Sequence, residues 1–325
     1  MGRVETERGA GERWTLSIGR FRQIALVTTV GLCLLVVAGG IVRLTGSGLG
    51  CDDWPNCNDQ SFVDVSSGHT AIEQVNRLLS GLIGIPTLAM AIGAFRVRPA
   101  RPRRGPTGLV VPSTVVLLTV LANGVVGGIA VRRDLHPALV QSHFLLAMTS
   151  IAFSLVAVHR ASTAPEHREP EASPRLRRLV IAVTALTAAA IVTGTVVTGT
   201  GPHAGEEDVR RWGFDISTVA RVHSTFVLAT VAIAIALAVQ LRREPPTVRH
   251  RSTAILSAWM FIAVLQGGVG YVQYFTGVPE ILVAAHIAGA TGLWVVTVWL
   301  ALELTRRIPA VEVSQVDSSA VVRSM

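Results

Sequence analysis

Long apolar runs alternate with short polar segments along the chain, and this alternation is its strongest pattern. Each run is about 20 to 25 residues long, which as an α-helix spans the about 30 Å hydrocarbon core of a bilayer. The pattern therefore predicts an all-α integral membrane protein with eight transmembrane helices. The predicted helices cover residues 22–42, 71–95, 108–131, 138–158, 179–199, 217–241, 253–275 and 280–304.

The composition agrees with a membrane location, and the charges predict an orientation. Of the 325 residues, 50% are hydrophobic and 15% are charged, and 29 arginines without any lysine give a net charge of +8. Such a charge would suit nucleic-acid binding if it formed one face. Instead, 22 of the 29 arginines fall in the two tails and in the loops on the same side as the tails. By the positive-inside rule that side is the cytoplasm, so both termini are expected there, and no nucleic-acid partner is expected.

Two cysteines lie in the first outer loop, within the sequence CDDWPNC. The outer side of most bacterial membranes is oxidising, so Cys51 and Cys57 are expected to form a short structural disulfide. Two free thiols or a redox-active pair are the alternatives. Cys33 lies in the first apolar run and is expected only to pack there.

The second half of the chain repeats motifs of the first half in the same order. VAGGIVRLTGSG in the first helix matches VTGTVVTGTG in the fifth, VLANGV in the third matches VLQGGV in the seventh, and LVQSH in the fourth matches LVAAH in the eighth. Four helices return the chain to its starting side, so the copies are parallel repeats about an axis along the membrane normal. The alternative explanation is the Gly- and Val-rich composition common in membrane helices.

The repeat predicts two four-helix bundles with similar interiors. We expect an N-terminal bundle and a C-terminal bundle joined by a cytoplasmic linker and flanked by cytoplasmic tails. These parts are the tail 1–21, the bundle 22–160, the linker 161–178, the bundle 179–304 and the tail 305–325.

Three of the nine histidines fall inside predicted helices. His143, His223 and His286 all lie about 9–12 Å below the outer interface, and His143 and His286 are equivalent in the repeat. A single membrane histidine is usually a hydrogen-bonding residue, but three at one depth indicate a functional site. The others are expected in cytoplasmic loops or near the outer boundary: His159, His167 and His250 solvated in loops, and His69, His136 and His203 near the boundary.

Two imidazoles on facing helices of a bundle are suited to both axial positions of a haem iron. His223 and His286 would form such a pair in the C-terminal bundle, while zinc would need further ligands at the same depth. In the N-terminal bundle, His143 is available, and Asn76 takes the position equivalent to His223. Asn76 lies in the motif IEQVNR, where Glu73 precedes it by three residues and therefore shares its helix face. Arg77 follows Glu73 by one turn, so a purely structural ion pair is the alternative to a functional carboxylate.

Several motifs together resemble the haem A synthase family. They are GSGLGCDDWPNC, IEQVNRLL, LVQSH, ARVH and AAHIAG, and they extend over residues 22–304. The arginine-rich, lysine-free composition and the segment TGTGPHAG are similar to the actinobacterial branch of this family.

The resemblance implies a multi-pass protein of the bacterial plasma membrane that oxidises the C8 methyl group of haem O to a formyl group. The product, haem A, serves cytochrome c oxidase. The resemblance also implies a cofactor haem b bound by His223 and His286, a haem O substrate near His143, and a catalytic role for Glu73. The family has a second histidine where this chain has Asn76, which suggests a five-coordinate substrate iron or one weakly capped by Asn76 or water.

Some assignments stay open at the sequence level. Arg77 and Arg221 are candidate partners of haem propionates or of Glu73, and His203 could belong to a lid, contact a propionate or lie in a plain turn. The alternative functions are a di-haem b-type electron-transfer cytochrome, a haem-binding oxidase assembly factor and a transporter or scaffold. Contacts with haem O synthase and with the oxidase assembly machinery are further hypotheses, and the oligomeric state is open.

Overall fold

The computed structural model describes residues 14–97, 106–162 and 172–305. Within them the chain forms eight α-helices and an isolated β-bridge between Leu16 and Val97. Each helix is long and apolar enough to cross a membrane, as the hydropathy pattern predicts. The helices are α1 Ile18–Leu44, α2 Gly68–Ala94, α3 Pro106–Val131, α4 Pro137–Ser162, α5 Pro174–Thr200, α6 Ile216–Leu241, α7 Pro246–Phe275 and α8 Glu280–Leu304.

The helices begin where the local sequence supplies caps. The side chains of Ser17, Ser67, Ser173 and Asp215 each accept a hydrogen bond from a backbone N–H in the first turn of α1, α2, α5 and α6. Because these caps precede the apolar runs, the helices extend beyond the predicted limits. In particular, α5 begins at Pro174, inside the segment expected as the linker 161–178. The predicted tails 1–21 and 305–325 lie mostly outside the described residues, and so does His167.

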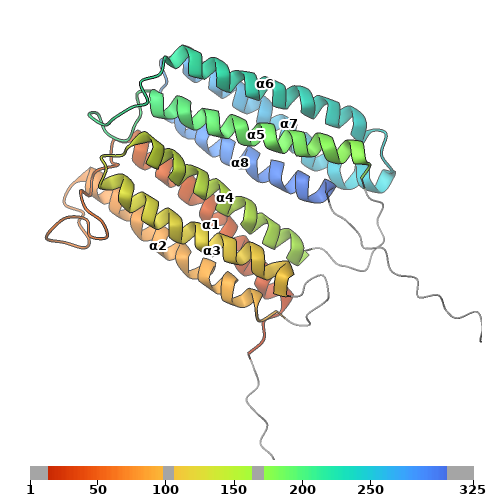
Figure 1. Cartoon of the computed structure of the whole chain (residues 1–325), viewed down its shortest axis with the longest axis horizontal. Coiled ribbons are helices and arrows are strands. Elements are labelled where there is room, and N and C mark those ends of the chain that lie inside the picture. The colour runs from red at the N-terminus through yellow and green to blue at the C-terminus, as the bar shows by residue number, and fades with distance from the viewer. Residues whose placement is uncertain (1–13, 98–105, 163–171, 306–325) are drawn as a thin grey trace, which may run out of the picture.

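The helices pack as two groups of four (Figure 1). In the first group α1 contacts α2 and α4, and α3 contacts α2 and α4; in the second, α5 contacts α6 and α8, and α7 contacts α6 and α8. Contacts between the groups join α1 to α8, α4 to α8 and α4 to α5. A repeat of four helices would give this set of neighbours, because α1–α8 and α5–α4 are then equivalent contacts. The repeat itself stays a prediction that the packing supports.

The core contains one apolar cluster in each group, with a few polar bonds between helices. Phe21, Met90 and Ile151 are fully buried in the first cluster, and Trp259 and Leu300 are buried in the second. The indole of Trp294 on α8 donates to the carbonyl oxygen of Met148 on α4 at 2.9 Å, which ties the two groups together. Such bonds hold membrane helices together where lipid removes most of the hydrophobic driving force.

A polar cluster also joins the groups, at the end where α4 and α8 finish. His159 Nε2 lies 3.2 Å from Glu303 Oε2, and Arg251 Nε lies 3.4 Å from Glu303 Oε1. The His159 ring also meets Trp299 edge-on, with ring centres 5.3 Å apart. The expectation of a solvated His159 in a loop is therefore wrong: α4 continues to Ser162, and His159 is only 5% exposed. His250 is exposed as expected, but it lies in the first turn of α7 instead of a loop.

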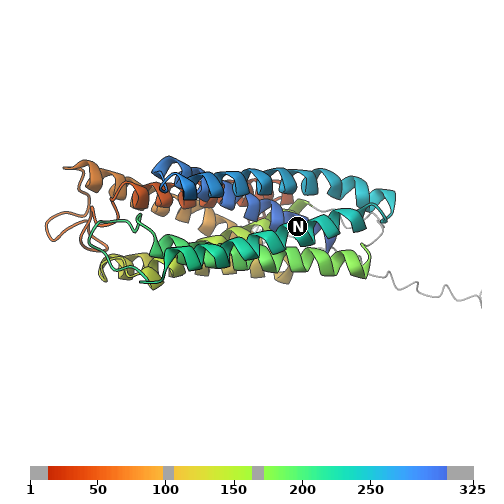
Figure 2. The same cartoon turned by 90° about the horizontal axis from the view of Figure 1, so that it is seen from above.

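At the opposite end, the loops after α1 and α5 meet (Figures 1 and 2). The backbone N–H of Gly48 donates to the carbonyl oxygen of Gly205 at 3.0 Å. Arg43 on α1 donates to the carbonyl oxygens of His203 at 2.5 Å and Thr198 at 2.7 Å. His203 Nε2 in turn donates to the carbonyl oxygen of Val278 at 2.7 Å. His203 thus links the loop after α5 to α1 and to the loop between α7 and α8, and Arg43 makes a contact that the sequence did not indicate.

Candidate functional site

Two of the predicted histidines face each other inside the second group of helices. His223 on α6 and His286 on α8 have ring centres 6.5 Å apart, with their planes at 74°. A metal bound to two imidazoles at about 2.0–2.1 Å per bond places the ring centres about 6 Å apart. The observed separation fits a metal, such as a haem iron, between the two rings.

The hydrogen bonds of His223 leave one ring nitrogen available. Its Nδ1 lies 2.9 Å from the carbonyl oxygen of Ala190 and 3.3 Å from the hydroxyl of Thr193. A carbonyl oxygen can only accept, so Nδ1 carries the hydrogen, and the neutral ring keeps a lone pair on Nε2. This arrangement of a ligating histidine fixes both its tautomer and its orientation.

His143 in the first group has the same arrangement. Its Nδ1 lies 3.1 Å from the carbonyl oxygen of Asn123 on α3, which again leaves Nε2 with a lone pair. His143 is exposed, although it lies on a membrane helix. An imidazole in that position is costly unless it has a partner or a ligand. For His286 the buried Nδ1 has no hydrogen-bond partner among the described residues.

A glycine on the preceding helix makes room for each of these rings. A Cβ atom on Gly127 would lie 3.0 Å from the Cε1 of His143, one on Gly194 would lie 3.1 Å from that of His223, and one on Gly270 would lie 3.2 Å from that of His286. Contacts this short would require each ring to shift by a few tenths of an ångström, so each glycine leaves room for its histidine in the observed place. The sequence motifs did not point to these glycines. Gly127 and Gly270 each precede their histidine by the same number of residues, and this spacing could have revealed them.

The donor set fits a haem better than a bare metal ion. Within residues 14–97, 106–162 and 172–305, no group of three or more His, Cys, Asp or Glu side chains could hold a metal ion. Structural zinc needs four such ligands, and catalytic zinc usually has three. Two opposed imidazoles instead match the axial positions of a haem, whose porphyrin supplies the other four ligands.

Glu73 and Arg77 form the centre of a polar network beneath the loop between α1 and α2. Arg77 Nη2 lies 2.6 Å from Glu73 Oε1, and Arg77 Nε donates to the same oxygen at 3.0 Å. Glu73 Oε2 accepts the backbone N–H of Cys51 at 2.6 Å. Both carboxylate oxygens are therefore engaged, and Glu73 is only 5% exposed. The ion pair that the spacing suggested is present.

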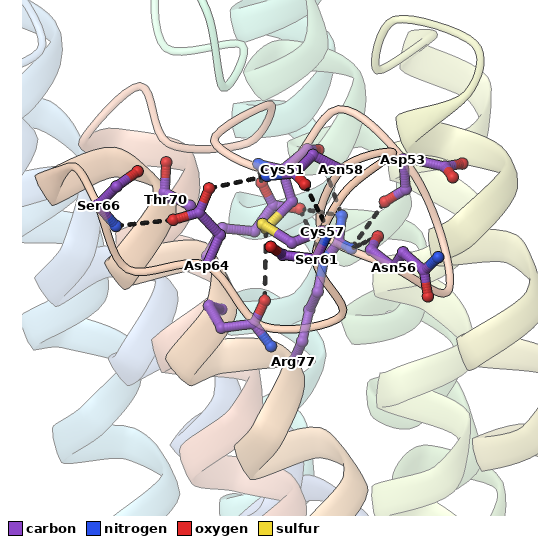
Figure 3. Close-up of a disulfide and its surroundings, with 12 residues drawn as sticks. Cys51, Asp53, Asn56, Cys57, Asn58, Ser61, Asp64, Ser66, Thr70 and Arg77 are labelled. Atoms are coloured by element: carbon purple, nitrogen blue, oxygen red, sulfur yellow. Dashed lines mark hydrogen bonds and ion pairs between the residues drawn. A yellow bond between two sulfur atoms is a disulfide. The ribbon is translucent and has the colours of Figure 1, made fainter.

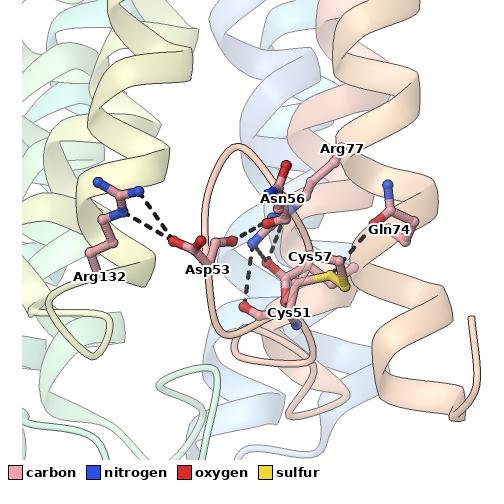
Figure 4. A network of polar contacts seen from close by, with 8 residues as sticks. Cys51, Asp53, Asn56, Cys57, Gln74, Arg77 and Arg132 are labelled. Carbon is pink, nitrogen blue, oxygen red and sulfur yellow. Dashed lines mark hydrogen bonds and ion pairs between the residues drawn. A yellow bond between two sulfur atoms is a disulfide. The ribbon is translucent and has the colours of Figure 1, made fainter. Parts of the chain in front are cut away.

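The rest of the Arg77 guanidinium binds the loop backbone (Figures 3 and 4). Its Nη1 donates to the carbonyl oxygens of Asp53 at 2.8 Å and Asn56 at 3.1 Å, and Nη2 donates to that of Cys51 at 3.3 Å. A disulfide joins Cys51 to Cys57, and both residues are buried. The guanidinium thus holds the disulfide-closed segment against α2.

Asp53 connects the same loop to Arg132, the residue that directly follows α3. The Asp53 carboxylate lies 3.2 Å from Arg132 Nη2 (Figure 4). Arg132 also donates to the carbonyl oxygen of Trp54. A hydrogen bond from the Trp54 backbone, together with Arg132, lowers the pKa of Asp53 below its ordinary value. Asp53 is therefore ionised at neutral pH, so the contact with Arg132 is an ion pair. No sequence pattern indicated this contact.

Asn76 and Arg221, the other predicted site residues, make few contacts. The Oδ1 atom of Asn76 is buried without a hydrogen-bond partner among the described residues. Arg221 is exposed on α6, where its Nη2 lies 3.5 Å from the hydroxyl of Ser217. Of the two partners expected for Arg221, Glu73 is already paired with Arg77. A haem propionate is the other expected partner.

These features define a class: a multi-pass helical membrane protein with a pair of imidazoles suited to be the two axial ligands of a haem iron. The chain matches the family model COX15-CtaA, described as cytochrome oxidase assembly protein, over residues 22–298. The match covers most of the chain, so this protein belongs to that family.

Relatives named heme A synthase match the chain at modest identity. The protein from Exiguobacterium sp. is 26% identical over 250 residues, which cover 74% of this chain and 79% of the relative. That from Geobacillus kaustophilus is 41% identical over 73 residues, or 22% of this chain and 23% of the relative. That from Alkalihalophilus pseudofirmus is 27% identical over 181 residues, or 55% and 59%. In the last two, the matched region covers less than two thirds of the relative.

Substitution of Gly194 tests whether the glycines position the ligands. In Gly194→Ala, the new Cβ would lie 3.1 Å from the Cε1 of His223 and would push the ring aside. Changes around a metal ligand typically weaken metal binding about 10- to 100-fold, so we expect a clear loss of bound haem per protein. The measurement is a haem titration followed by absorbance. Gly292→Ala on α8 is the control, because nothing lies within 4 Å of its Cβ position; an equal loss there would contradict the role of Gly194.

Proposed function

We propose that this protein is a haem A synthase, which oxidises the C8 methyl group of haem O to the formyl group of haem A. The observation that carries the proposal is the pair His223 and His286, with ring centres 6.5 Å apart, in a chain of the cytochrome oxidase assembly family. The name of the relatives supports the product. Two successive two-electron oxidations would each add one hydroxyl group to the methyl carbon, with the oxygen taken from O2 or water and the electrons passed to an external carrier. The resulting hydrate loses water to form the aldehyde.

The two groups of helices divide the work in this proposal. The C-terminal bundle, residues 179–304, holds a cofactor haem b on His223 and His286, and the N-terminal bundle, residues 22–160, receives haem O at His143. When bound, haem b supplies one-electron redox chemistry between the substrate site and an external electron carrier. The Nδ1–H bonds of His223 and His143 to backbone carbonyl oxygens keep each Nε2 free to bind iron.

Glu73 acts mainly by positioning in this proposal. Both of its oxygens are occupied by Arg77 and the Cys51 backbone. To accept a proton from the substrate, the carboxylate would first have to release one of these donors. Glu73 therefore supports the reaction by holding the disulfide-closed loop at the outer end of α2, and a direct proton transfer is the alternative.

The arginine distribution predicts the orientation of the protein, and the proposed function implies its partners. Both termini lie in the cytoplasm of a bacterial cell, and the disulfide loop faces outward, as the arginine distribution predicts. Haem O enters from the enzyme that makes it, and haem A leaves toward cytochrome c oxidase assembly. A di-haem electron-transfer cytochrome is less well supported, since four axial histidines would be needed and the described membrane helices place only three at the required depth.

The direct test is production of haem A in cells that make haem O but lack their own haem A synthase. Membranes from cells expressing this chain are expected to contain extractable haem A, separated from haem O by chromatography. The His143→Ala variant is expected to leave haem O unconverted, because the substrate iron loses its protein ligand, while the spectrum of bound haem b persists. Absence of haem A with the full-length, haem-loaded chain would overturn the proposed function.

A further inference from the structure

We infer that the N-terminal haem site keeps one axial position open, beside Asn76, and that this position binds a diatomic ligand. The inference rests on the proposed function in so far as a haem binds at His143. It deepens that function by assigning different coordination to the two sites. The C-terminal site is closed on both sides by imidazole, whereas the N-terminal site has a protein ligand on one side only.

The contrast begins with the repeat. His286 on α8 is equivalent to His143 on α4, and His223 on α6 is equivalent to Asn76 on α2. In the second bundle His223 and His286 face each other. The repeat therefore places Asn76 on the side of the N-terminal site opposite His143.

The glycine positions support an unfilled place at Asn76. Each of the three histidine rings lies 3.0–3.2 Å from the Cβ position of a glycine on the preceding helix. The repeat gives a fourth glycine at the equivalent position, Gly39 on α1, which matches Gly194 in the repeated motif. Nothing lies within 4 Å of its Cβ position. Beside each of the other three glycines, an imidazole ring fills the space. Beside Gly39 the shorter Asn76 side chain does not reach that space.

Two buried oxygen atoms in this bundle have no partner. Asn76 Oδ1 and Asn123 Oδ1 are buried without a hydrogen bond from any described residue. Asn123 lies one turn before Gly127 on the α3 face that contacts His143. Buried polar atoms normally have partners, and an amide oxygen can only accept, so these two indicate that a donor such as water belongs beside them.

The chemistry of Asn76 favours an open iron position over a capped one. A neutral amide is a much poorer iron ligand than imidazole, and an asparagine side chain is shorter than a histidine. An amide can, however, donate a hydrogen bond to the outer atom of a diatomic molecule bound to iron. Polarity and hydrogen-bond donors in a distal pocket are the features that control diatomic binding to haem.

The test uses carbon monoxide as the probe on the full chain, purified in detergent and loaded with haem b at both sites. After reduction with dithionite, the wild-type protein is expected to bind carbon monoxide at one of its two haems. The Asn76→His variant is expected to lower the reactive fraction at least about ten-fold, because a second imidazole closes the axial position. The same variant should convert the N-terminal haem to a low-spin spectrum, read by electron paramagnetic resonance of the oxidised form.

Matched variants keep the result interpretable. Ser80→His adds an imidazole one turn further along α2 and is expected to leave the reactive fraction unchanged. His286→Ala opens the second site and is expected to make both haems reactive. His143→Ala should abolish uptake of the second haem. A wild-type protein with two haems and no carbon monoxide binding, an Asn76→His variant as reactive as wild type, or second-haem uptake independent of His143 would overturn the inference.

The two proposals can fail separately. If the cells accumulate haem A but the purified protein does not bind carbon monoxide, the open position is wrong and the proposed function stands. If carbon monoxide binds at one of two haems but no haem A forms, the coordination assignment stands and the proposed function fails.

Discussion

The His223→Ala variant is expected to lose the low-spin haem b spectrum and the formation of haem A together. The variant removes one of the two imidazoles whose ring centres lie 6.5 Å apart, and the remaining His286 can fill only one axial position. The Nδ1–H bond to the Ala190 carbonyl oxygen, which orients the ring, is lost as well. The measurements are the pyridine haemochrome content of the purified protein and the ratio of haem A to haem O in membranes.

Two comparisons give this prediction its specificity. His250→Ala changes an exposed histidine in the first turn of α7 and is expected to leave both measurements unchanged. Added free imidazole is expected to restore a low-spin spectrum to His223→Ala, because it can occupy the space that the ring has left. A normal haem spectrum in His223→Ala without added imidazole would remove His223 from the ligand set and would leave the second bundle without its proposed role.

The sequence was sufficient for the helices because hydropathy is a property of consecutive residues. Eight runs of about 20 apolar residues must each span the bilayer, whatever their neighbours. The depth of His143, His223 and His286 followed from the same count along each helix. The pairing of His223 with His286 required one further step, the repeat, which indicated that α6 and α8 belong to the same bundle.

Contacts between distant segments were harder to predict because they depend on packing. His159 and Glu303 are 144 residues apart, and the end of an apolar run gave no sign that His159 turns inward. Arg43 looked like one of the few outer arginines, yet it binds backbone carbonyl oxygens of α5 and the following loop. The partners of Arg77 in the loop are backbone atoms, which any sequence supplies, so no residue pattern could identify them.

The Glu73→Ala variant is expected to reduce haem A formation at least about ten-fold and to destabilise the loop between α1 and α2. Loss of the carboxylate leaves the half-buried Arg77 guanidinium without its counter-charge and the buried Cys51 N–H without its acceptor. Because Arg77 keeps its bonds to three loop carbonyl oxygens, the cost is expected to be below the about 3–5 kcal/mol of a fully buried ion pair that loses one partner. The measurements are the ratio of haem A to haem O in membranes and the thermal midpoint of the purified protein. Glu207→Ala is the control, because Glu207 is exposed in the loop between α5 and α6. This variant should change neither the haem ratio nor the thermal midpoint.

The Glu73→Gln variant separates positioning from proton transfer. A glutamine side chain has nearly the same shape and keeps an amide oxygen that can accept the hydrogen bonds of Arg77. Its NH2 group replaces the oxygen that accepts the Cys51 N–H, and it cannot accept a proton as a carboxylate does. If Glu73 works by holding the loop, Glu73→Gln should retain clearly more haem A formation and a higher thermal midpoint than Glu73→Ala. If the carboxylate takes part in the chemistry, both variants should be equally inactive, even where Glu73→Gln keeps the wild-type midpoint. The occupied oxygens of Glu73 lead us to expect the first result, since the group is already saturated by donors from α2 and the loop.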